Sequence, residues 1–205
     1  MEEDYDDYNQ EHINKRWQQY IDTVVKVHPL MLKAFEIAEN ENISLKNAID
    51  IGCGPGNETN FLVEQNIQTL ALDYNDECLN KIKDSFPNLI KNKLFSFQGI
   101  RIENFVWKSA DLMISLKVLP FLTKEIYEIT LEKIKINLNS GGLFVASVFG
   151  KNDDWQHLSL TSSESIKKIF KNFEELYFCE KEGSLKVVSG EVKKTHLIDF
   201  IYRKN

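Results

Sequence analysis

The stretch NAIDIGCGPGNETNFL, residues 47–62, constrains the fold of this chain more than any other. Gly52, Gly54 and Gly56 stand at every second position, after an apolar run and before a helical pattern. Glycines in that context let the backbone approach a ligand closely and present its N–H groups and the helix N-terminus. A tight strand-to-helix turn without a ligand gives the same pattern, so a second feature is needed to decide.

Asp73 is that second feature. It ends the next β-rich run, TLALDY, where a carboxylate can accept both hydroxyls of a ribose. Nicotinamide cofactors use the same topology, but their GxGxxG fingerprint needs Gly or Ala three residues after Gly54, where this chain has Asn57. The order here is D-x-G-x-G-x-G, starting at Asp50. Together, the glycine loop and the acid favour a ribose-containing ligand over a plain turn.

Short β-rich runs alternate with helical ones along most of the chain. The predicted strands cover residues 47–53, 69–74, 94–99, 110–116 and 142–150, and the predicted helices cover 57–65, 76–86, 123–137 and a short segment after TSSES. Nearly continuous apolar strands that alternate with helices predict a parallel sheet covered on both faces.

The two ends of the chain depart from this alternation. Two β-like runs, 174–183 and 195–204, leave no room for a helix between them, so they predict an antiparallel hairpin at one edge. Two amphipathic helices are predicted between His12 and Asn40, the second opening at Pro29. The first ten residues carry five acids and no base, which predicts a flexible acidic tail over residues 1–10.

Length and composition are those of an ordinary globular protein. With 205 residues, 42% hydrophobic and 27% charged, the chain is predicted to form one domain over residues 11–205, with a helical cap at 11–45 and a core at 46–205. A net charge of -6 argues against a nucleic-acid-binding surface. The start lacks a signal peptide, and no apolar run approaches a membrane span, so a soluble, cytoplasmic protein without membrane contact is expected.

Cysteines and histidines give no sign of a metal. The three cysteines are far apart and form no CxxC pattern, and the four histidines are scattered without an i, i+4 pair. The sequence therefore predicts neither a disulfide framework nor a metal site.

The D-x-G-x-G-x-G pattern resembles that of the class I S-adenosylmethionine (SAM) methyltransferases. The resemblance runs from about Lys46 to the C-terminus and includes the terminal hairpin, which in that family is the reversed seventh strand. It implies an α/β, Rossmann-like, doubly wound seven-stranded sheet, mostly parallel, with an antiparallel C-terminal hairpin and N-terminal helices. It also implies SAM as cofactor and S-adenosylhomocysteine (SAH) as product.

The resemblance assigns the cofactor-binding residues one by one. Asp50 would lie near the methionine amino group, the glycine loop would admit the methionine and ribose portion, and Asp73 would bind the ribose diol. Tyr74 could pack on adenine or simply end its strand. The complete cofactor set is Asp50, Gly52, Cys53, Gly54, Gly56, Asp73, Tyr74, Gly99, Ile100, Ser115 and Leu116.

Gly99 departs from the family pattern, which often has an acid there to meet the adenine amino group. Adenine would then depend on the backbone around Gly99 and Ile100, on water, or on Glu103. Ser115 and Leu116 would lie beneath the sulfonium, whereas Asp111, at the start of the same strand, is expected to be structural.

A narrower resemblance connects the chain with the small bacterial tellurite-resistance (TehB-like) methyltransferases. FGKNDDW, residues 149–155, and SGEVKKTHLIDFIYRK, residues 189–204, resemble motifs of that group, as does a helical tryptophan before the glycine loop. The acceptor pocket that this resemblance implies consists of Phe149, Asp153 and Trp155, with Trp17 and Tyr20 either closing it or packing. His157 is the candidate base, and the catalytic residue is otherwise open.

A small-molecule methyl acceptor is expected, since the chain has neither an inserted recognition domain nor the NPPY motif, with SLKVLPF in its place. No cysteine is expected to be catalytic. Two alternatives stay open at this point, a SAM- or SAH-binding protein without turnover and a NAD(P)-dependent oxidoreductase. The sequence reveals neither the acceptor nor whether the protein is a monomer or a homodimer.

Overall fold

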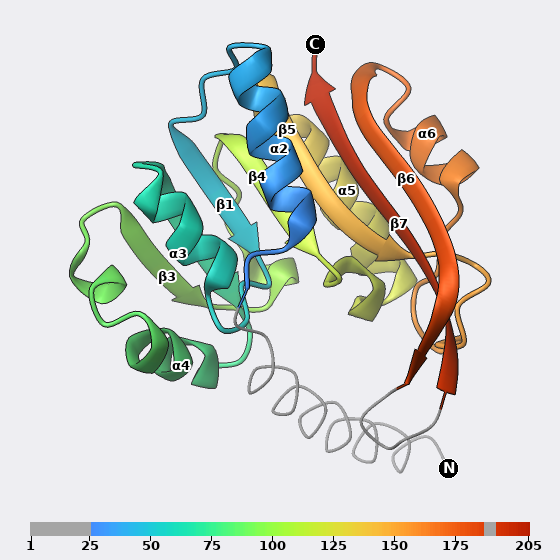
Figure 1. The fold of residues 1–205 in the computed structure, drawn as a ribbon, viewed down its shortest axis with the longest axis horizontal. Coiled ribbons are helices and arrows are strands. Elements are labelled where there is room, and N and C mark those ends of the chain that lie inside the picture. The colour runs from blue at the N-terminus through green and yellow to red at the C-terminus, as the bar shows by residue number, and fades with distance from the viewer. Residues whose placement is uncertain (1–25, 187–191) are drawn as a thin grey trace.

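Seven strands form one sheet in the order β3-β2-β1-β4-β5-β7-β6 in the computed structural model, which describes residues 26–186 and 192–205 (Figure 1). The first five strands are parallel to one another, and β7 is antiparallel to both of its neighbours. The strands are β1 (Asn47–Ile51), β2 (Gln68–Asp73), β3 (Phe95–Gly99), β4 (Ala110–Leu116), β5 (Leu138–Phe149), β6 (Phe173–Lys186) and β7 (Val192–Lys204).

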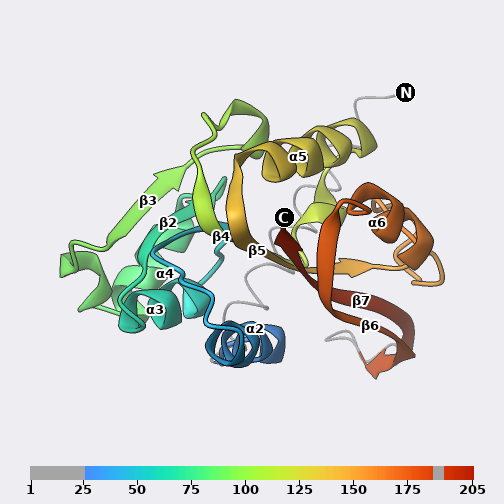
Figure 2. The same ribbon diagram turned by 90° about the horizontal axis from the view of Figure 1, so that it is seen from above.

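Helices cover both faces of the sheet. Figure 2 shows α2, α3 and α4 on one face and α5 and α6 on the other. The helices are α2 (Pro29–Asn40), α3 (Asn57–Glu64), α4 (Glu77–Ser85), α5 (Lys124–Asn137) and α6 (Ser163–Ile169), with short 3-10 turns η1 (Leu89–Lys91), η2 (Ile102–Asn104) and η3 (Leu119–Phe121). The predicted Rossmann-like fold with a terminal antiparallel hairpin is confirmed.

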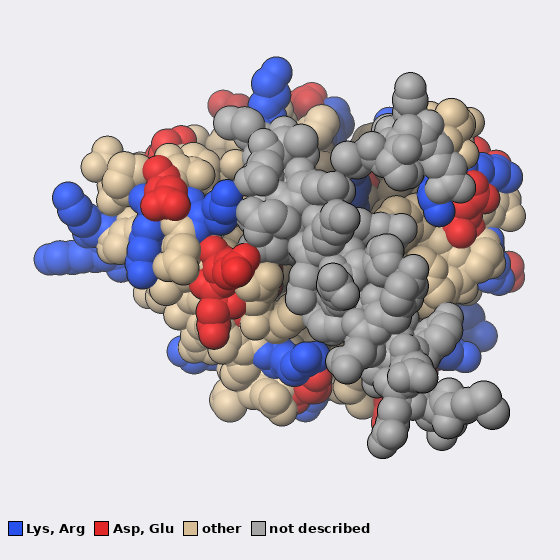
Figure 3. Space-filling view, turned by 90° about the horizontal axis from the view of Figure 1, so that it is seen from below, with Lys and Arg blue, Asp and Glu red and all other residues tan. Residues whose placement is uncertain are grey.

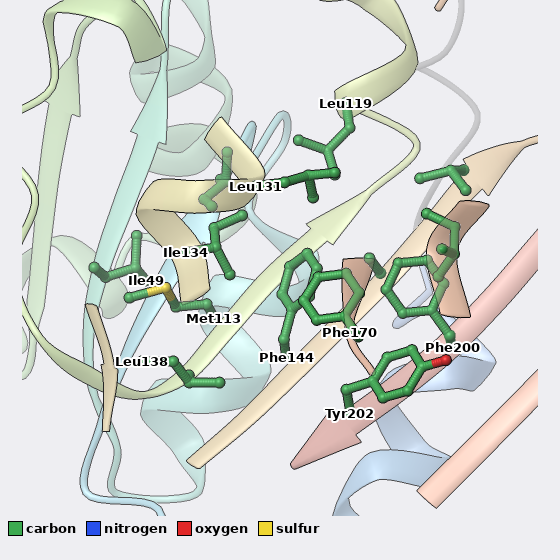
Figure 4. Packing of buried hydrophobic residues seen from close by; sticks show 14 of the residues in the cluster. Ile49, Met113, Leu119, Leu131, Ile134, Leu138, Phe144, Phe170, Phe200 and Tyr202 are labelled. Carbon is green, nitrogen blue, oxygen red and sulfur yellow. The ribbon is translucent and has the colours of Figure 1, made fainter. Parts of the chain in front are cut away.

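Separate apolar clusters fill the two faces. Under α5 and α6, aromatic rings from β5 and β7 pack with Phe170, the residue that follows α6, and the rings of Phe170 and Tyr202 stack 5.0 Å apart (Figure 4). On the other face, Leu30, Met31 and Ala34 of α2 pack against the central strands. Because strand side chains alternate between faces, β1, β4, β5 and β7 contribute to both clusters, whereas Ala71 of β2 and the phenylalanines of β3 pack in a third cluster with Ile82 of α4.

Local signals in the sequence fix several element boundaries. Pro29 opens α2, and the ring of His28 caps it by accepting a hydrogen bond from the Leu30 N–H through Nδ1 at 3.2 Å. Thr123 caps α5 in the same way through its hydroxyl, which accepts from the Ile126 N–H.

Some boundaries differ from the prediction. Strand β5 begins at Leu138, four residues before the predicted start, because Leu138 pairs with Ala110 before the register shifts. Gly141 absorbs the shift with a φ of 77°. The two hairpin strands, β6 and β7, are both longer than predicted, and each extends further toward the turn that joins them.

The predicted helix around Trp17 and Tyr20 and the acidic tail lie outside the described residues. No helix within the described residues is long and apolar enough to cross a membrane.

Candidate functional site

One row of residues crosses the sheet at the end where the parallel strands finish. Strand register aligns Asp73 with Gly99, and Leu116 with Ser147. Gly52 follows β1 at the level of both Asp73 and Leu116, because Ile51 pairs with Leu72 and Asp50 with Ile114. From β3 to β6 the row contains Gly99, Asp73, Gly52, Leu116, Ser147, Asp199 and Cys179.

This row crosses the point where the strand order reverses, between β1 and β4. Ligands of open α/β sheets bind at such a switch point, outside the carboxyl ends of the strands. Figure 3 looks onto that edge, and acidic and basic side chains are interspersed over the part of the face that the structure describes. The row is therefore the candidate site, and it contains the predicted residues Gly52, Asp73, Gly99 and Leu116.

The three loop glycines have different structural roles. Gly52, Gly54 and Gly56 have φ values of 71°, 49° and 83°. A Cβ on Gly52 would overlap the Val118 side chain, and one on Gly56 would overlap Ile82. A Cβ on Gly54 would meet no atom of the described residues within 4 Å. Gly52 and Gly56 thus allow close packing, whereas the described residues leave space beside the Cα of buried Gly54.

The carboxylate of Asp73 is fixed against this loop. Its Oδ2 accepts a hydrogen bond from the Gly54 N–H at 3.0 Å, and its Oδ1 accepts from the Asn75 N–H at 3.0 Å. Burial raises the pKa of Asp73, although these hydrogen bonds and one from the Cys78 thiol oppose the shift. A ribose diol beside Gly54 would therefore meet a preoriented carboxylate, as the sequence predicts.

Asp50 lies beneath the loop on the α2 and α3 face. The hydroxyl of Thr59 donates to its Oδ2 at 2.6 Å, and burial together with the nearby charge of Glu58 raises the pKa of Asp50 to about 8. Burial also raises the pKa of Glu58, whose Oε1 accepts from the His28 N–H at 2.8 Å. A cationic group beside Asp50 would favour its ionised form. The predicted place for the methionine amino group has the chemistry to hold a cation.

The β3 end of the row contains an acid that was not predicted from the sequence. A Cβ on Gly99 would overlap the carboxylate of Asp76, which caps no helix N–H at the start of α4. The glycine thus makes room for an acid from the neighbouring loop, three residues after Asp73. The sequence signal that could have indicated this residue is an acid, Asp76, at the start of a predicted helix.

Two other predicted adenine contacts are placed differently. The N–H of Ile100 already donates to the Asp73 carbonyl at 2.8 Å, so it is not free for a base. Glu103 lines a separate hollow of about 580 Å³ between η2 and α5. Tyr74 is 45% exposed, and the Arg101 guanidinium lies 5.4 Å from its ring centroid.

Aromatic side chains gather beyond the part of the row that β4 and β5 form. The rings of Phe149 and Trp155 lie 6.4 Å apart, and Phe121 of η3 lies 6.1 Å from Phe149 and 6.4 Å from Trp155. The ring of exposed His157 lies 5.9 Å from Trp155. The structure thus brings together three of the predicted residues and adds Phe121, which the sequence reading left out.

Asp153, also predicted to line the acceptor pocket, is buried and holds the loop. Its Oδ1 accepts from the Trp155 N–H at 3.0 Å, and its Oδ2 accepts from the His196 N–H at 2.8 Å. The ring of His196 occupies the space that a side chain at Gly150 would need, and its Nδ1 accepts from the Asn152 N–H at 3.1 Å. Asp153 and His196 therefore position the aromatic loop through its backbone.

The remaining predicted residues have mainly structural surroundings. Asp111 accepts from the Lys46 and Asn47 N–H groups, which supports the expected structural role. Burial raises the pKa of both Cys53 and Cys78, so neither forms a thiolate readily. Ser115 is fully buried, and its hydroxyl has no partner among the described residues. Across residues 26–186 and 192–205, no group of three or more His, Cys, Asp or Glu side chains is placed to hold a metal ion.

Comparisons with known proteins agree with this geometry. A family model described as a methyltransferase domain matches residues 43–200, so the chain belongs to that methyltransferase family. No curated protein sequence matches the chain. Its fold is the one shared by class I SAM-dependent methyltransferases.

Several solved structures show the likeness of fold. TehB from Haemophilus influenzae is 21% identical with a TM-score of 0.74, over 89% of this chain and 64% of TehB, so this chain spans less than two thirds of that protein. A SAM-dependent methyltransferase from Clostridium acetobutylicum is 17% identical with a TM-score of 0.66, over 97% of this chain and 99% of the other.

A third structure contains ligands. The 1,6-didemethyltoxoflavin-N1-methyltransferase from Burkholderia thailandensis, with 1,6-didemethyltoxoflavin and SAH bound, is 14% identical with a TM-score of 0.66, over 99% of this chain and 90% of the other. The predicted resemblance to TehB-like methyltransferases is thus confirmed at the level of the fold.

Proposed function

We propose that this protein binds SAM along the row at the carboxyl edge of the sheet and transfers its methyl group to a small-molecule acceptor. The observation that carries the proposal is the pairing of Asp73 with the Gly54 N–H, at a glycine beside which the described residues leave open space. The carboxylate and the open loop match a ribose, and buried Asp50 matches an ammonium group. The residues present therefore fit the cofactor.

The chain's own contribution would be to bind, orient and exclude water. SAM supplies an activated methyl group, because its sulfonium leaves as a neutral thioether. Asp73 and Gly54 would fix the ribose, and Asp50 the amino group. Leu116, level with Gly52 in the row, would then lie next to the reacting carbon. Positioning of this kind is worth effective molarities of about 10⁵ M or more.

Adenine recognition would involve Asp76 in place of the acid missing at position 99. Its carboxylate lies over Gly99 at the end of β3, and it makes no helix-capping hydrogen bond. The exocyclic amino group of adenine is a donor, which a carboxylate accepts. Tyr74, exposed at the end of β2, would pack against the base.

A small acceptor is favoured over a macromolecule. The Burkholderia neighbour holds the small molecule 1,6-didemethyltoxoflavin beside SAH, and the net charge of -6 disfavours nucleic acid. Phe149, Trp155 and Phe121 would supply the apolar rim of the acceptor pocket, with His157 at its edge as the candidate base.

Calorimetry with SAH on the wild type and on Asp73→Ala tests the cofactor proposal. Loss of a charged hydrogen-bond acceptor for the ribose should weaken binding by about 1 to 3 kcal/mol. Asp84→Ala, at an exposed position on α4, is the matched control and should bind as the wild type does. Saturable NADH binding without SAH binding would instead favour the oxidoreductase alternative.

A further inference from the structure

The half of the row that the cofactor leaves free is polar. Ser147 of β5, Asp199 of β7 and Cys179 of β6 stand opposite one another in register. Paired strand residues point to the same face. Val145 and Ile201, two residues away on these strands, pack in the cluster beneath α2, so Ser147 and Asp199 lie on the α2 face.

Two polar atoms in this half have no partner. Ser147 is fully buried, and its hydroxyl makes no hydrogen bond within the described part of the chain. The same is true of the buried Oδ1 of Asp199, directly opposite Ser147. Leaving a buried polar atom unpaired costs about 1 to 3 kcal/mol. Two such atoms at adjacent positions mark a place where a ligand would satisfy both.

The surroundings place these atoms on the acceptor side of the proposed site. Leu116, the row member next to the predicted sulfonium position, pairs with Ser147, and the following residue, Lys117, donates its N–H to the Ser147 carbonyl at 2.8 Å. Phe149, from the aromatic rim, lies two residues beyond Ser147 and therefore on the same face.

Among the described residues, no cationic side chain forms an ion pair with the Asp199 carboxylate, which could therefore bind a ligand. His28 lies near enough to feel the charge of Asp199, but burial and Lys117 lower the pKa of His28, which favours its neutral form. Lys117 also interacts with Glu58. The buried Oδ1 of Asp199 also accepts no hydrogen bond from the described residues.

We propose that Asp199 and Ser147 bind the methyl acceptor, and that this acceptor presents an N–H or O–H group on an apolar body. This inference rests on the proposed function. The lone pair of the acceptor atom would form the new bond to the methyl carbon as the carbon–sulfur bond breaks and its electron pair passes to sulfur. The acceptor's proton would pass to the Asp199 carboxylate and then to water. A carboxylate-bearing acceptor would be repelled.

Benzylamine and benzoate are suitable probes, because they share a ring and carry opposite charges near neutral pH. Each would be titrated into the full chain with and without saturating SAH, with binding followed by NMR or calorimetry. Wild type should bind benzylamine at least about tenfold more tightly than benzoate. Asp199→Asn should abolish that preference, Ser147→Ala should reduce it several-fold, and Asp84→Asn, on the exposed side of α4, should leave it unchanged.

SAH affinity separates the possible failures. A variant that binds SAH as the wild type does is folded. If Asp199→Asn is unstable, Ser147→Ala still tests the inference, because it removes only one hydroxyl. Failure of wild type to bind SAH would contradict the cofactor proposal. The titrations without SAH would still test whether Asp199 and Ser147 bind benzylamine in preference to benzoate. Equal binding of the two probes, no binding of benzylamine, or a preference that survives both variants would overturn the inference.

Discussion

The two buried acids of the candidate site, Asp73 and Asp50, differ in their hydrogen-bond partners and in the charges near them. Asp73 is held by two backbone N–H groups, whereas Asp50 has one hydroxyl partner and a nearby acid, Glu58. Burial, together with the charge of Glu58, raises the pKa of Asp50 to about 8. Its ionisation should be coupled to cofactor binding.

The predicted coupling has a definite sign. The cationic amino group of the cofactor favours ionised Asp50, so binding near neutral pH should release protons and tighten as pH rises toward about 8. Calorimetry with SAH in buffers of different ionisation enthalpy measures that release. Asp50→Asn should lose most of it, and an equal release from the variant would contradict the assignment.

The same shift affects folding stability in the free protein. The folded state holds the Asp50 proton more tightly than the unfolded chain, whose pKa is near 3.8. The contribution of Asp50 is therefore fully present below that value and is lost as pH rises through about 8.

Asp76 gives a second prediction at the scale of one residue. S-inosylhomocysteine, which lacks the adenine amino group, should bind wild type more weakly than SAH. Asp76→Ala should narrow that difference by about 1 to 3 kcal/mol, because a carboxylate that accepts from the amino group is lost. Calorimetry with both ligands gives the comparison, and an undiminished difference in the variant would exclude Asp76 from adenine recognition.

At the scale of elements, the glycines of the loop are expected to have different roles, Gly56 in packing and Gly54 in ligand binding. Gly56→Ala should lower the free energy of unfolding by more than about 1 to 2 kcal/mol, since it forces both a left-handed backbone and an overlap with Ile82. Gly54→Ala should lower the free energy of unfolding less, because no atom of the described residues lies within 4 Å of the new methyl group, yet it should prevent SAH binding. Denaturant titration and calorimetry measure the two effects. Reversed effects would mean that Gly54 does not face the ligand.

The elements were largely predictable because periodicity and turn residues are local signals. β4 was predicted at its observed bounds, Ala110–Leu116, and α2 begins at Pro29 as expected. The early start of β5 was not predicted, because it depends on Leu138 pairing with a distant strand.

The candidate site was predictable where a residue lies in a motif and was missed where only register reveals it. Asp73 and Gly54 lie in recognisable patterns, and their contact follows from adjacent strands. Asp199 and Ser147 come into one row only through the pairing of β5 with β7, and Asp76 meets Gly99 only across a loop. No local pattern carries that information.

At the scale of the whole molecule, the proposed site extends along one edge of the sheet, and different strands would bind its two ligands. In the proposed site, the cofactor would lie over β1, β2 and β3, and the acceptor would lie over β5, β6 and β7. The antiparallel hairpin thus does more than close the sheet, because β7 delivers Asp199 to the row. This arrangement accounts for a polar residue in a strand whose neighbours Ile198 and Phe200 are fully buried.

The most direct test is transfer of a labelled methyl group. The protein would be incubated with methyl-labelled SAM and a library of small amines, hydroxyl compounds and carboxylates, and the products would be identified by mass spectrometry. The account predicts label on an amine or hydroxyl compound, with SAH formed in equal amount and both reduced in Asp73→Ala when SAM is subsaturating. SAM binding without label on any compound would contradict it and favour a binding protein without turnover.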